Sequence, residues 1–313
     1  MNILVTGGAG FIGSHVVDAL VDDHLITVVD DLSYGHEHHV NQEAIFLNLS
    51  ITDPGIDDIF VSGNFDAVLH FAAQKGVRPS FDDPVFDAEL NVIGLLRILE
   101  ASRKHNVKNV VLASTGGTIY GEAQEIPTPE TASIDPQSPY TITKRAGELY
   151  LRYYSNRFGM NGVTMRLANI FGPRQDPAGE AGVVSIFIER LLAGQPLTIY
   201  GDGNQTRDYL YIDDAVAAFV AVVDQMGSGI AGDYNVGTGQ ETSVNQIVGA
   251  IERVYGNPIE VKHTEAIVGE LKRSAIASQL FAEKFNWQPE VSLNEGIEQT
   301  WEWFKSGGFS VDV

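Results

Sequence analysis

The chain has 313 residues, 44% hydrophobic and 19% charged, so it can bury a sizeable core and is neither disordered nor collagen-like. Its 41 acidic residues against 20 basic ones give a formal charge of -21, which argues against nucleic-acid and membrane-surface partners. The lack of cysteine excludes disulfides, thiolate-bound zinc and cysteine nucleophiles. With no signal peptide or bilayer-spanning apolar stretch in the sequence, we expect a cytoplasmic protein.

Strand-like and helix-like segments alternate through the first half of the chain. Short β-branched runs predict strands at 3–6, 26–29, 45–47, 67–71, 110–114 and 163–167. Apolar residues at helical spacing predict helices at 13–21, 91–105 and 139–158. This alternation predicts an α/β fold with a doubly wound, mainly parallel sheet, whose ligand crevice lies at the carboxyl ends of the strands.

The pattern loosens after Phe171, where glycine and proline are frequent. Helical patterns follow at 183–193, 244–255 and 293–305, and DYNVG at 233–237 is strand-like. We therefore expect residues 1–171 to form one domain, completed by a returning strand near 233–238. Residues 172–313 are expected to form mainly a smaller second α/β lobe.

A glycine-rich turn, TGGAGFIG at residues 6–13, follows the first predicted strand and opens the first predicted helix. Its glycines allow a tight turn and let backbone N–H groups approach a pyrophosphate. Asp30 ends the second predicted strand, where the dinucleotide fingerprint places an acid for the adenosine ribose. Because no Arg in 31–35 could accept a 2′-phosphate, we expect NAD rather than NADP. The alternative is a structural turn with an unrelated acid.

Tyr140 and Lys144 lie four residues apart in the helix predicted at 139–158, so they share one face. A phenol is a poor base at neutral pH unless a nearby cation stabilises its phenolate, and Lys144 with an oxidised nicotinamide would do so. Such a pair alone is usually a solvated helix face. The dinucleotide fingerprint earlier in the chain favours the catalytic interpretation.

Seven ordered motifs between Thr6 and Asp214 resemble the extended short-chain dehydrogenase/reductase family, specifically its NAD-dependent nucleotide-sugar epimerases of the UDP-glucose 4-epimerase type. They are TGGAGFIGSH, HFAAQKGVRPS, Asn91 in LNVIG, ASTGGTIYGE, Tyr140 to Lys144, RLANIFGPRQ and TRDYLYIDD. The resemblance implies a Rossmann-type domain that holds NAD, a carboxy-terminal lobe that holds a nucleotide sugar, and chemistry at the sugar's C4.

The resemblance also implies roles for individual residues. It places the cofactor against Gly7, Gly10, Phe11, Ile12, Gly13, Asp30, Asp31, Leu32, Ser33, Gly35, Ser50, Ile51, Phe71, Ala72, Ala73, Gln74, Lys75, Asn91, Tyr140 and Lys144. It places the substrate against Asn169, Arg207, Arg273 and Ser274. For Arg207 the alternative is a surface ion pair with Asp202 or Asp208. The helices at 91–105 and 140–158 are expected to pack as a bundle in a homodimer.

Three positions depart from the family pattern. The family's catalytic Ser or Thr falls on Gly116, so Thr115 or Thr118 must supply that hydroxyl unless none is needed. The segment Ser50-Ile51 lacks the acid expected near the adenine. The segment IVGE at 267–270 lacks an expected phosphate-binding arginine at Ile267, for which Lys272 or Arg273 are candidate replacements.

The segment before Tyr120 discriminates among the family's reactions. Relatives that dehydrate sugars need an acid and a base where this chain has Gly117 and Thr118, and neither residue exchanges a proton at neutral pH. This favours C4 epimerisation of UDP-glucose and UDP-galactose through a 4-keto intermediate, and the small Ser274 predicts room for N-acetyl sugars. The alternatives are a UDP-glucuronate 4-epimerase, other 4-keto chemistry on a nucleotide sugar, or a non-catalytic NAD-binding regulator.

His36, His38 and His39 with Glu37 resemble metal ligands. No matching spacing of acids and histidines elsewhere completes a site, so we expect an exposed polar loop and no metal.

Overall fold

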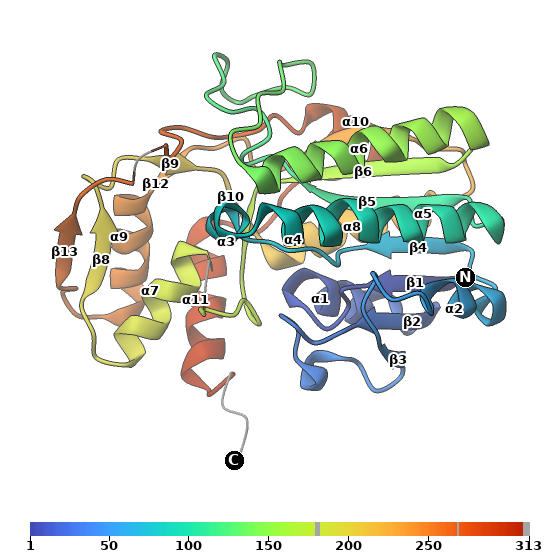
Figure 1. Ribbon diagram of the computed structural model, residues 1–313. Coiled ribbons are helices and arrows are strands. Elements are labelled where there is room, and N and C mark those ends of the chain that lie inside the picture. Colours follow the sequence, from blue (N-terminus) through green and yellow to red (C-terminus); the bar gives the residue numbers. More distant parts are fainter. Residues whose placement is uncertain (179–181, 268, 309–313) are drawn as a thin grey trace.

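Six strands within residues 2–167 and a seventh at 232–236 form one parallel sheet, which Figure 1 shows between two layers of helices. The computed structural model describes residues 1–178, 182–267 and 269–308. The strand order is β11-β6-β5-β4-β1-β2-β3, and every neighbouring pair is parallel. The strands are β1 (Asn2–Thr6), β2 (Leu25–Asp30), β3 (Ile45–Asn48), β4 (Ala67–His70), β5 (Asn109–Thr115), β6 (Asn161–Leu167) and β11 (Gly232–Val236). The predicted doubly wound α/β sheet is confirmed.

The strands are apolar on both sides, because each face of the sheet carries its own core. In β1, Ile3 and Val5 belong to one cluster of buried residues, and Leu4 between them belongs to the other. The order of the strands reverses between β1 and β4. A ligand crevice is therefore expected at the carboxyl ends of these two strands and their neighbours.

Helices cover both faces of the sheet. One layer contains α2 (Ile56–Gly63), α5 (Leu95–Lys104) and α6 (Pro139–Phe158). The other contains α1 (Phe11–Leu20), α8 (Ile212–Asp224) and α10 (Gln279–Phe285). The helix predicted at 91–105 differs, because α3 (Val77–Asp82), α4 (Pro84–Ala88) and a π-helical turn (Glu89–Gly94) precede α5.

Helix α6 has the bounds predicted from its sequence. Its amino end is capped by Ser138, whose Oγ accepts the backbone N–H of Thr141, and Pro139 occupies the first turn. Its carboxyl end is Gly159, at φ +66°. The amino-terminal cap at Ser138 therefore fixes the start of the helix at Pro139, one residue before Tyr140.

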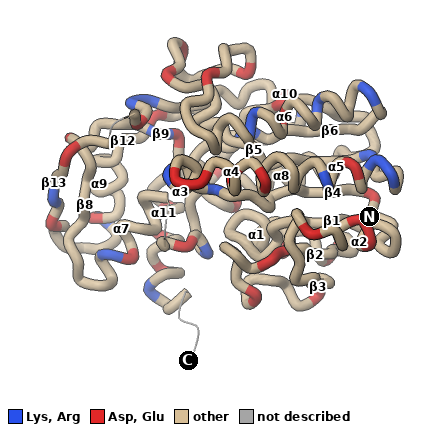
Figure 2. The backbone as a smooth tube through the Cα atoms, viewed as in Figure 1, with Lys and Arg blue, Asp and Glu red and all other residues tan. Residues whose placement is uncertain are grey.

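The second lobe lies beside the carboxyl ends of the sheet (Figure 1). It consists of α7 (Val183–Leu192), α9 (Val244–Tyr255) and α11 (Leu293–Lys305), with the parallel pair β8 (Leu197–Tyr200) and β13 (Val261–Thr264). Two further short pairings are β7 (Asn169–Phe171) with β10 (Tyr209–Tyr211), which joins the segment after β6 to the later part of the chain, and β9 (Thr206–Arg207) with β12 (Thr242–Ser243). Figure 2 shows acidic positions on both lobes. Within the described ranges, no helix has the length and apolar composition needed to cross a bilayer.

Candidate active site

A long pocket opens at the carboxyl ends of the central strands and collects most of the residues predicted to bind the cofactor. Its wall includes Gly7, Gly10, Phe11, Ile12, Gly13, Asp30, Asp31, Ser33, Gly35, Ile51, Phe71, Ala72, Ala73, Lys75, Tyr140 and Lys144. These residues come from segments as far apart in the sequence as β1 and α6. The fold brings them together because parallel strands place their carboxyl ends along one edge.

Two glycines of the glycine-rich turn, Gly7 and Gly13, have no room for a side chain. Gly7 has φ +74°, and a Cβ there would lie 2.5 Å from the backbone nitrogen of Ala72. A Cβ on Gly13 would lie 2.2 Å from the carbonyl oxygen of Gly7. No described side chain caps the amino end of α1, and its first turn carries no acidic residue. The positive end of this helix is thus open to an anionic group at the pocket.

Asp30 lies at the end of β2, in the pocket wall. Its carboxylate accepts the backbone N–H groups of Ala9 at 3.0 Å and Leu32 at 2.9 Å, so it also ties the glycine-rich turn to the loop after β2. Burial raises the pKa of Asp30, while these two hydrogen bonds oppose that shift. Burial would also raise the pKa of the neighbouring Asp31, but hydrogen bonds from Ser33 and Ser50 lower it overall.

Tyr140 and Lys144 face the same pocket from the first turns of α6. The Lys144 ammonium lies 5.8 Å from the centre of the Tyr140 ring and donates a hydrogen bond to the carbonyl oxygen of Ala113 at 3.1 Å. Burial lowers the pKa of Lys144 to about 8, against the attraction of Asp87 and Glu148. The side chain therefore remains mostly a cation at neutral pH, which is what a nearby phenolate requires.

The structure explains why Gly116 replaces the family's hydroxyl residue. A Cβ at this position would lie 2.4 Å from Cδ1 of Ile276, so a serine would collide with a buried side chain. Thr115 lines the pocket together with Tyr140 and Lys144. Its Oγ1 lies 3.3 Å from Oγ1 of Thr118, which in turn accepts a hydrogen bond from Thr141. Thr115 is thus the threonine in the wall of the pocket that contains Tyr140, and Thr118 is not in that wall.

A second cavity adjoins the first on the side of the second lobe. Thr118 and Asn169 line it, and the two cavities share Thr115, Ala168, Ile170, Gln175 and Gly182. Asn169 begins β7, directly after the end of β6. A ligand that extends from the first cavity toward the second lobe would therefore pass these residues.

The predicted phosphate-binding arginines are paired with acids on the second lobe. Arg207 Nη2 lies 3.2 Å from Glu270, and the guanidinium of Arg273 binds the carboxylate of Glu241. Arg207 therefore forms an ion pair, but not with the suggested partners: Asp208 accepts the backbone N–H groups of Thr238 and Gly239, and Asp202 accepts the backbone N–H and the side-chain amide of Asn204. Val268, in the segment that departs from the family pattern, lies outside the described residues.

Ser274 contacts the loop after β5 but is not in the wall of either cavity. Its hydroxyl donates a hydrogen bond to the carbonyl oxygen of Gly117 at 2.9 Å, next to Thr118. The segment after β13 therefore contacts the loop after β5 directly. This contact places a small side chain at the boundary of the two lobes.

Four residues assigned to the cofactor lie outside the described pocket wall: Leu32, Ser50, Gln74 and Asn91. The Asn91 amide instead pairs with the backbone of Gln74, accepting its N–H at 2.8 Å and donating to its carbonyl at 3.1 Å. Asn91 also donates to Asp87 and Thr143. It therefore holds the loop that carries Phe71 to Lys75 against α6.

The pocket also contains residues that the sequence analysis did not assign. Tyr34 and Leu49 line it near Asp30, and Gln175 and Asp176 line it from the loop after β7. This loop is fastened to α1, because Arg174 forms an ion pair with Asp18 at 2.7 Å and His15 contacts the carbonyl oxygen of Pro173 at 3.0 Å. Gln175 is the last residue of the motif RLANIFGPRQ, so this motif could have pointed to it.

The histidine-rich loop differs from the exposed loop that was expected. Glu37 and His38 are exposed, but His39 is buried, because its ring packs against those of His36 and His38 with centroids 5.2 and 4.3 Å away. Among the described residues, no group of three acids or histidines is arranged to hold a metal ion.

The doubly wound sheet, the glycine-rich turn and the acid after β2 define the class of Rossmann-type dinucleotide-binding proteins. Residues 3–237 match the NAD dependent epimerase/dehydratase family, and the chain belongs to this family.

The similarity to several epimerases covers almost the whole chain. A UDP-glucose 4-epimerase of Mycolicibacterium smegmatis is 43% identical over 98% of this chain and 99% of its own. The crystal structure of a UDP-glucose 4-epimerase with UDP-glucose from Thermotoga maritima has a TM-score of 0.94 and 43% identity, covering 98% of this chain and 99% of that one. A UDP-N-acetylglucosamine 4-epimerase from Methanobrevibacter ruminantium, in complex with UDP-N-acetylmuramic acid, has a TM-score of 0.92 and 32% identity, covering 98% of each chain.

Proposed function

We propose that this protein is an NAD-dependent epimerase that inverts C4 of a UDP-hexose and interconverts UDP-glucose and UDP-galactose. The observation that carries the proposal is the pair of Tyr140 and Lys144 in the wall of the same pocket as the glycine-rich turn and Asp30. The named relatives in Mycolicibacterium smegmatis and Thermotoga maritima support the choice of reaction and substrate.

The residues of the pocket fit NAD. The glycine-rich turn and the open amino end of α1 would hold the pyrophosphate, and Asp30 would bind the adenosine ribose. Lys144 would hold the nicotinamide ribose, beside Phe71 and Lys75. When bound, NAD supplies an acceptor, and then a donor, of the hydride at C4 of the sugar.

The chain's own residues handle the proton. Tyr140 takes the proton of the sugar's 4-hydroxyl as its phenolate, which the Lys144 ammonium stabilises. We assign the neighbouring hydroxyl to Thr115, which orients the same 4-oxygen. The 4-keto sugar then presents its opposite face, and as C4 regains the hydride on that face the Tyr140 phenol returns the proton to the same 4-oxygen. The reaction is therefore redox-neutral, and the positions of Gly117 and Thr118 offer no acid and base for a dehydration.

The second lobe, within residues 172–313, is proposed to hold the nucleotide. Asn169 lies at its entrance, and Arg207 would bind the diphosphate by exchanging Glu270 for phosphate oxygens. Arg273 is proposed as the second cation in place of the arginine missing at Ile267. Ser274 leaves space beside C2 of the sugar, so N-acetyl sugars should also react, as the name of the Methanobrevibacter ruminantium relative suggests.

We also propose a homodimer formed through the outer faces of α4, α5 and α6. Exposed apolar side chains lie on α4, on the π-helical turn that leads into α5, and on α6: Val85, Phe86, Ile93, Ile142, Leu149, Tyr150 and Tyr153. Exposed apolar side chains gathered on neighbouring helices are typical of an interface. Ile142→Glu should yield a monomer in light scattering, whereas the wild type should be a dimer.

The direct test is a panel of nucleotide sugars. The NAD-loaded protein is incubated separately with UDP-glucose, UDP-galactose, UDP-N-acetylglucosamine, UDP-glucuronate and dTDP-glucose, and NMR and mass spectrometry identify the products. We expect the 4-epimers of the first three, at unchanged mass. Turnover of UDP-glucuronate alone, a product lighter by one water, or no turnover of any sugar would each contradict the proposal.

A further inference from the structure

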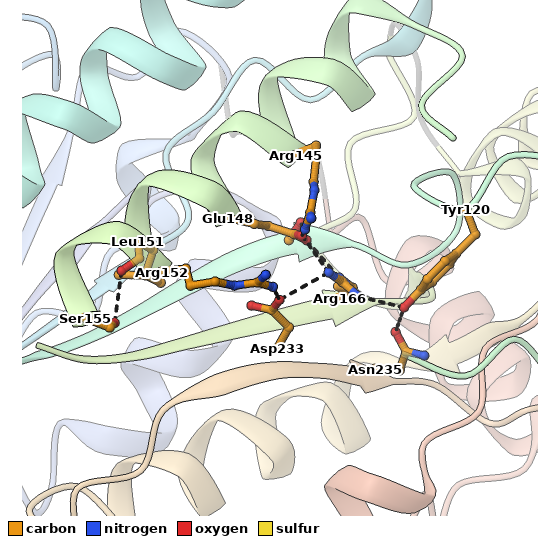
Figure 3. Close-up of polar contacts among 10 residues, drawn as sticks. Tyr120, Arg145, Glu148, Leu151, Arg152, Ser155, Arg166, Asp233 and Asn235 are labelled. Atoms are coloured by element: carbon orange, nitrogen blue, oxygen red, sulfur yellow. Dashed lines mark hydrogen bonds and ion pairs between the residues drawn. The ribbon is translucent and has the colours of Figure 1, made fainter. Parts of the chain in front are cut away.

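A cluster of charges built around the buried pair of Glu148 and Arg166 follows the Tyr140 and Lys144 turns of α6. Figure 3 shows it at the junction of α6, β6 and β11. Its members are Glu148, Arg145 and Arg152 of α6, Arg166 of β6 and Asp233 of β11. The proposed proton chemistry makes no direct use of these residues.

Glu148 is at the centre of the cluster and is fully buried. One carboxylate oxygen accepts Nε of Arg166 at 3.0 Å and the hydroxyl of Ser114 at 2.7 Å. The other accepts Nη2 of Arg166 at 2.7 Å and Nη1 of Arg145 at 2.8 Å. The two-point contact with Arg166 fixes the orientation of the carboxylate.

Arg166 joins this carboxylate to the edge of the sheet. Its Nη1 donates to the hydroxyl of Tyr120 at 2.9 Å, and its Nη2 lies 3.4 Å from Asp233 (Figure 3). Tyr120 in turn donates to Asn235 of β11. A buried ion pair of this kind contributes little net stability compared with apolar packing, because both charges lose their hydration. The two-point contact of this ion pair instead holds α6 and β6 in a fixed geometry next to the site.

Two contacts connect the cluster to the catalytic turn through consecutive residues of β5. The carbonyl oxygen of Ala113 accepts the Lys144 ammonium, and the hydroxyl of Ser114 donates to Glu148. Lys144 and Glu148 are one turn apart on the same face of α6. The next residue of β5, Thr115, lines the pocket. The carboxylate of Glu148 therefore sets how α6 sits on the end of β5.

The charge of Glu148 also acts on Lys144. The groups that face the Lys144 ammonium are Asp87 of α4, Glu148 and Tyr140 of α6, and His70 of β4. Burial lowers the pKa of His70 to about 3, so this ring is neutral. Asp87 and Glu148 are the two carboxylates that oppose the loss of the Lys144 proton on burial.

We propose that Glu148 is a positioning residue of this active site: its carboxylate, oriented by Arg166, fixes the Lys144 turn of α6 against β5 and helps to keep the Lys144 amine protonated. This inference deepens the proposed function and rests on it for its effect on turnover. Its effect on Lys144 does not require turnover.

The test compares Glu148→Gln with a matched control, Asp233→Asn. Both variants remove one carboxylate from the surroundings of Arg166 (Figure 3), but Asp233 belongs to β11 and, unlike Glu148, is not one of the carboxylates that oppose the loss of the Lys144 proton. The titration of Lys144 is followed in the NAD-loaded proteins by the NMR shift of its Cε in ¹³C-lysine-labelled protein, assigned with Lys144→Arg. We expect the midpoint in Glu148→Gln to fall by about one pH unit, because a nearby opposite charge is lost. The midpoint in Asp233→Asn should equal that of the wild type.

Turnover gives the second measurement. The decline of kcat at alkaline pH should begin about one pH unit lower in Glu148→Gln, and its KM for the UDP-sugar should be unchanged. An unchanged Lys144 midpoint in Glu148→Gln, or an equal shift in Asp233→Asn, would overturn the inference. A shifted midpoint in a protein whose wild type converts no UDP-hexose would refute the proposed function and leave the role of Glu148 standing.

If Glu148→Gln does not fold because Arg166 loses its counter-charge, the double variant Glu148→Gln/Arg166→Met replaces it. This variant removes the opposite charges together, so folding should be restored. The midpoint of its Lys144 titration should still lie below that of the wild type. The reason is that Glu148 contacts Ser114, the neighbour of the residue Ala113 that accepts the Lys144 ammonium, whereas Arg166 lies on the other side of Glu148. A midpoint equal to the wild type would show that Glu148 has only a structural role.

Discussion

The cofactor side and the substrate side of the site are built differently. On the cofactor side, glycines and strand ends define the pocket through the backbone, and it is preformed around residues such as Gly7 and Asp30. On the substrate side, long side chains define the site, and Arg207 and Arg273 are paired with acids of the chain itself. The comparison indicates that the proposed cofactor site depends on backbone shape and that the proposed substrate site depends on the exchange of ion pairs.

The largest effect is expected at the junction of the two sides, from Tyr140→Phe. Removing the phenol oxygen removes the proton acceptor, so kcat should fall by about 10³-fold. Because the backbone pocket is unchanged, the variant should keep its NAD, which the absorbance of the denatured protein's supernatant would quantify. Turnover close to that of the wild type would refute the assigned base and favour a different reaction.

A side chain at Gly7 should disrupt the cofactor side. Gly7→Ala places a Cβ at positive φ and against the backbone of Ala72, so the free energy of unfolding should fall by about 3 kcal/mol and NAD binding should be lost. The matched control is Gly249→Ala in α9, where a Cβ meets open space. The control should gain about 0.5–1 kcal/mol. Thermal and urea unfolding would measure both, and equal effects would contradict the argument.

Substitutions on the substrate side should change KM for the UDP-sugar. Arg207 is 15% exposed in its side chain and Arg273 is 60% exposed. Arg207→Met should raise KM for the UDP-sugar by about 30-fold with little change in NAD content, because a partly buried charged hydrogen bond is lost. Arg273→Met should raise KM by about threefold, because its charge is screened by water. A larger effect at Arg273 would reverse the assignment of the main diphosphate ligand.

The smallest effect is expected from breaking the ion pair that holds the loop after β7 against α1, next to the cofactor side. Asp18→Asn removes the partner of Arg174, so the loop that brings Gln175 and Asp176 to the pocket should open more often. NAD release should accelerate about threefold, because a partly exposed ion pair contributes up to about 1 kcal/mol. Glu260→Gln, which breaks an exposed pair with Lys262 on β13, is the control and should leave the release rate unchanged. Dialysis with absorbance readings would compare them.

The sequence predicted the sheet and several helices closely, because their signals are local. The helices at 139–158, 244–255 and 293–305 have the observed bounds, since Ser138, Ser243 and Ser292 cap their amino ends. The glycine-rich turn was recognisable because only glycine fits its close contacts.

Other features depend on contacts between distant segments, and the sequence alone did not show them. The helices α2, α3, α4, α8 and α10 were not predicted. Asn91 was assigned to the cofactor, but its amide supports the loop after β4. The need for Gly116 became visible only from Ile276, 160 residues further along the chain, whose side chain occupies the space of a Cβ. The acid partners of Arg207 and Arg273 likewise come from remote loops.

Strand β11 makes the two halves of the chain inseparable. It pairs with β6 along its whole length and supplies Asp233 and Asn235 to the residues around Arg166. A fragment ending at Phe171 would therefore lack the outer edge of its own sheet, and the helix that carries Tyr140 would lose support. Recombination at this boundary could exchange substrate specificity between relatives only if the donor segment also delivered this strand. Because β11 belongs to the sheet, the lobe and the sheet form one unit for expression and for redesign.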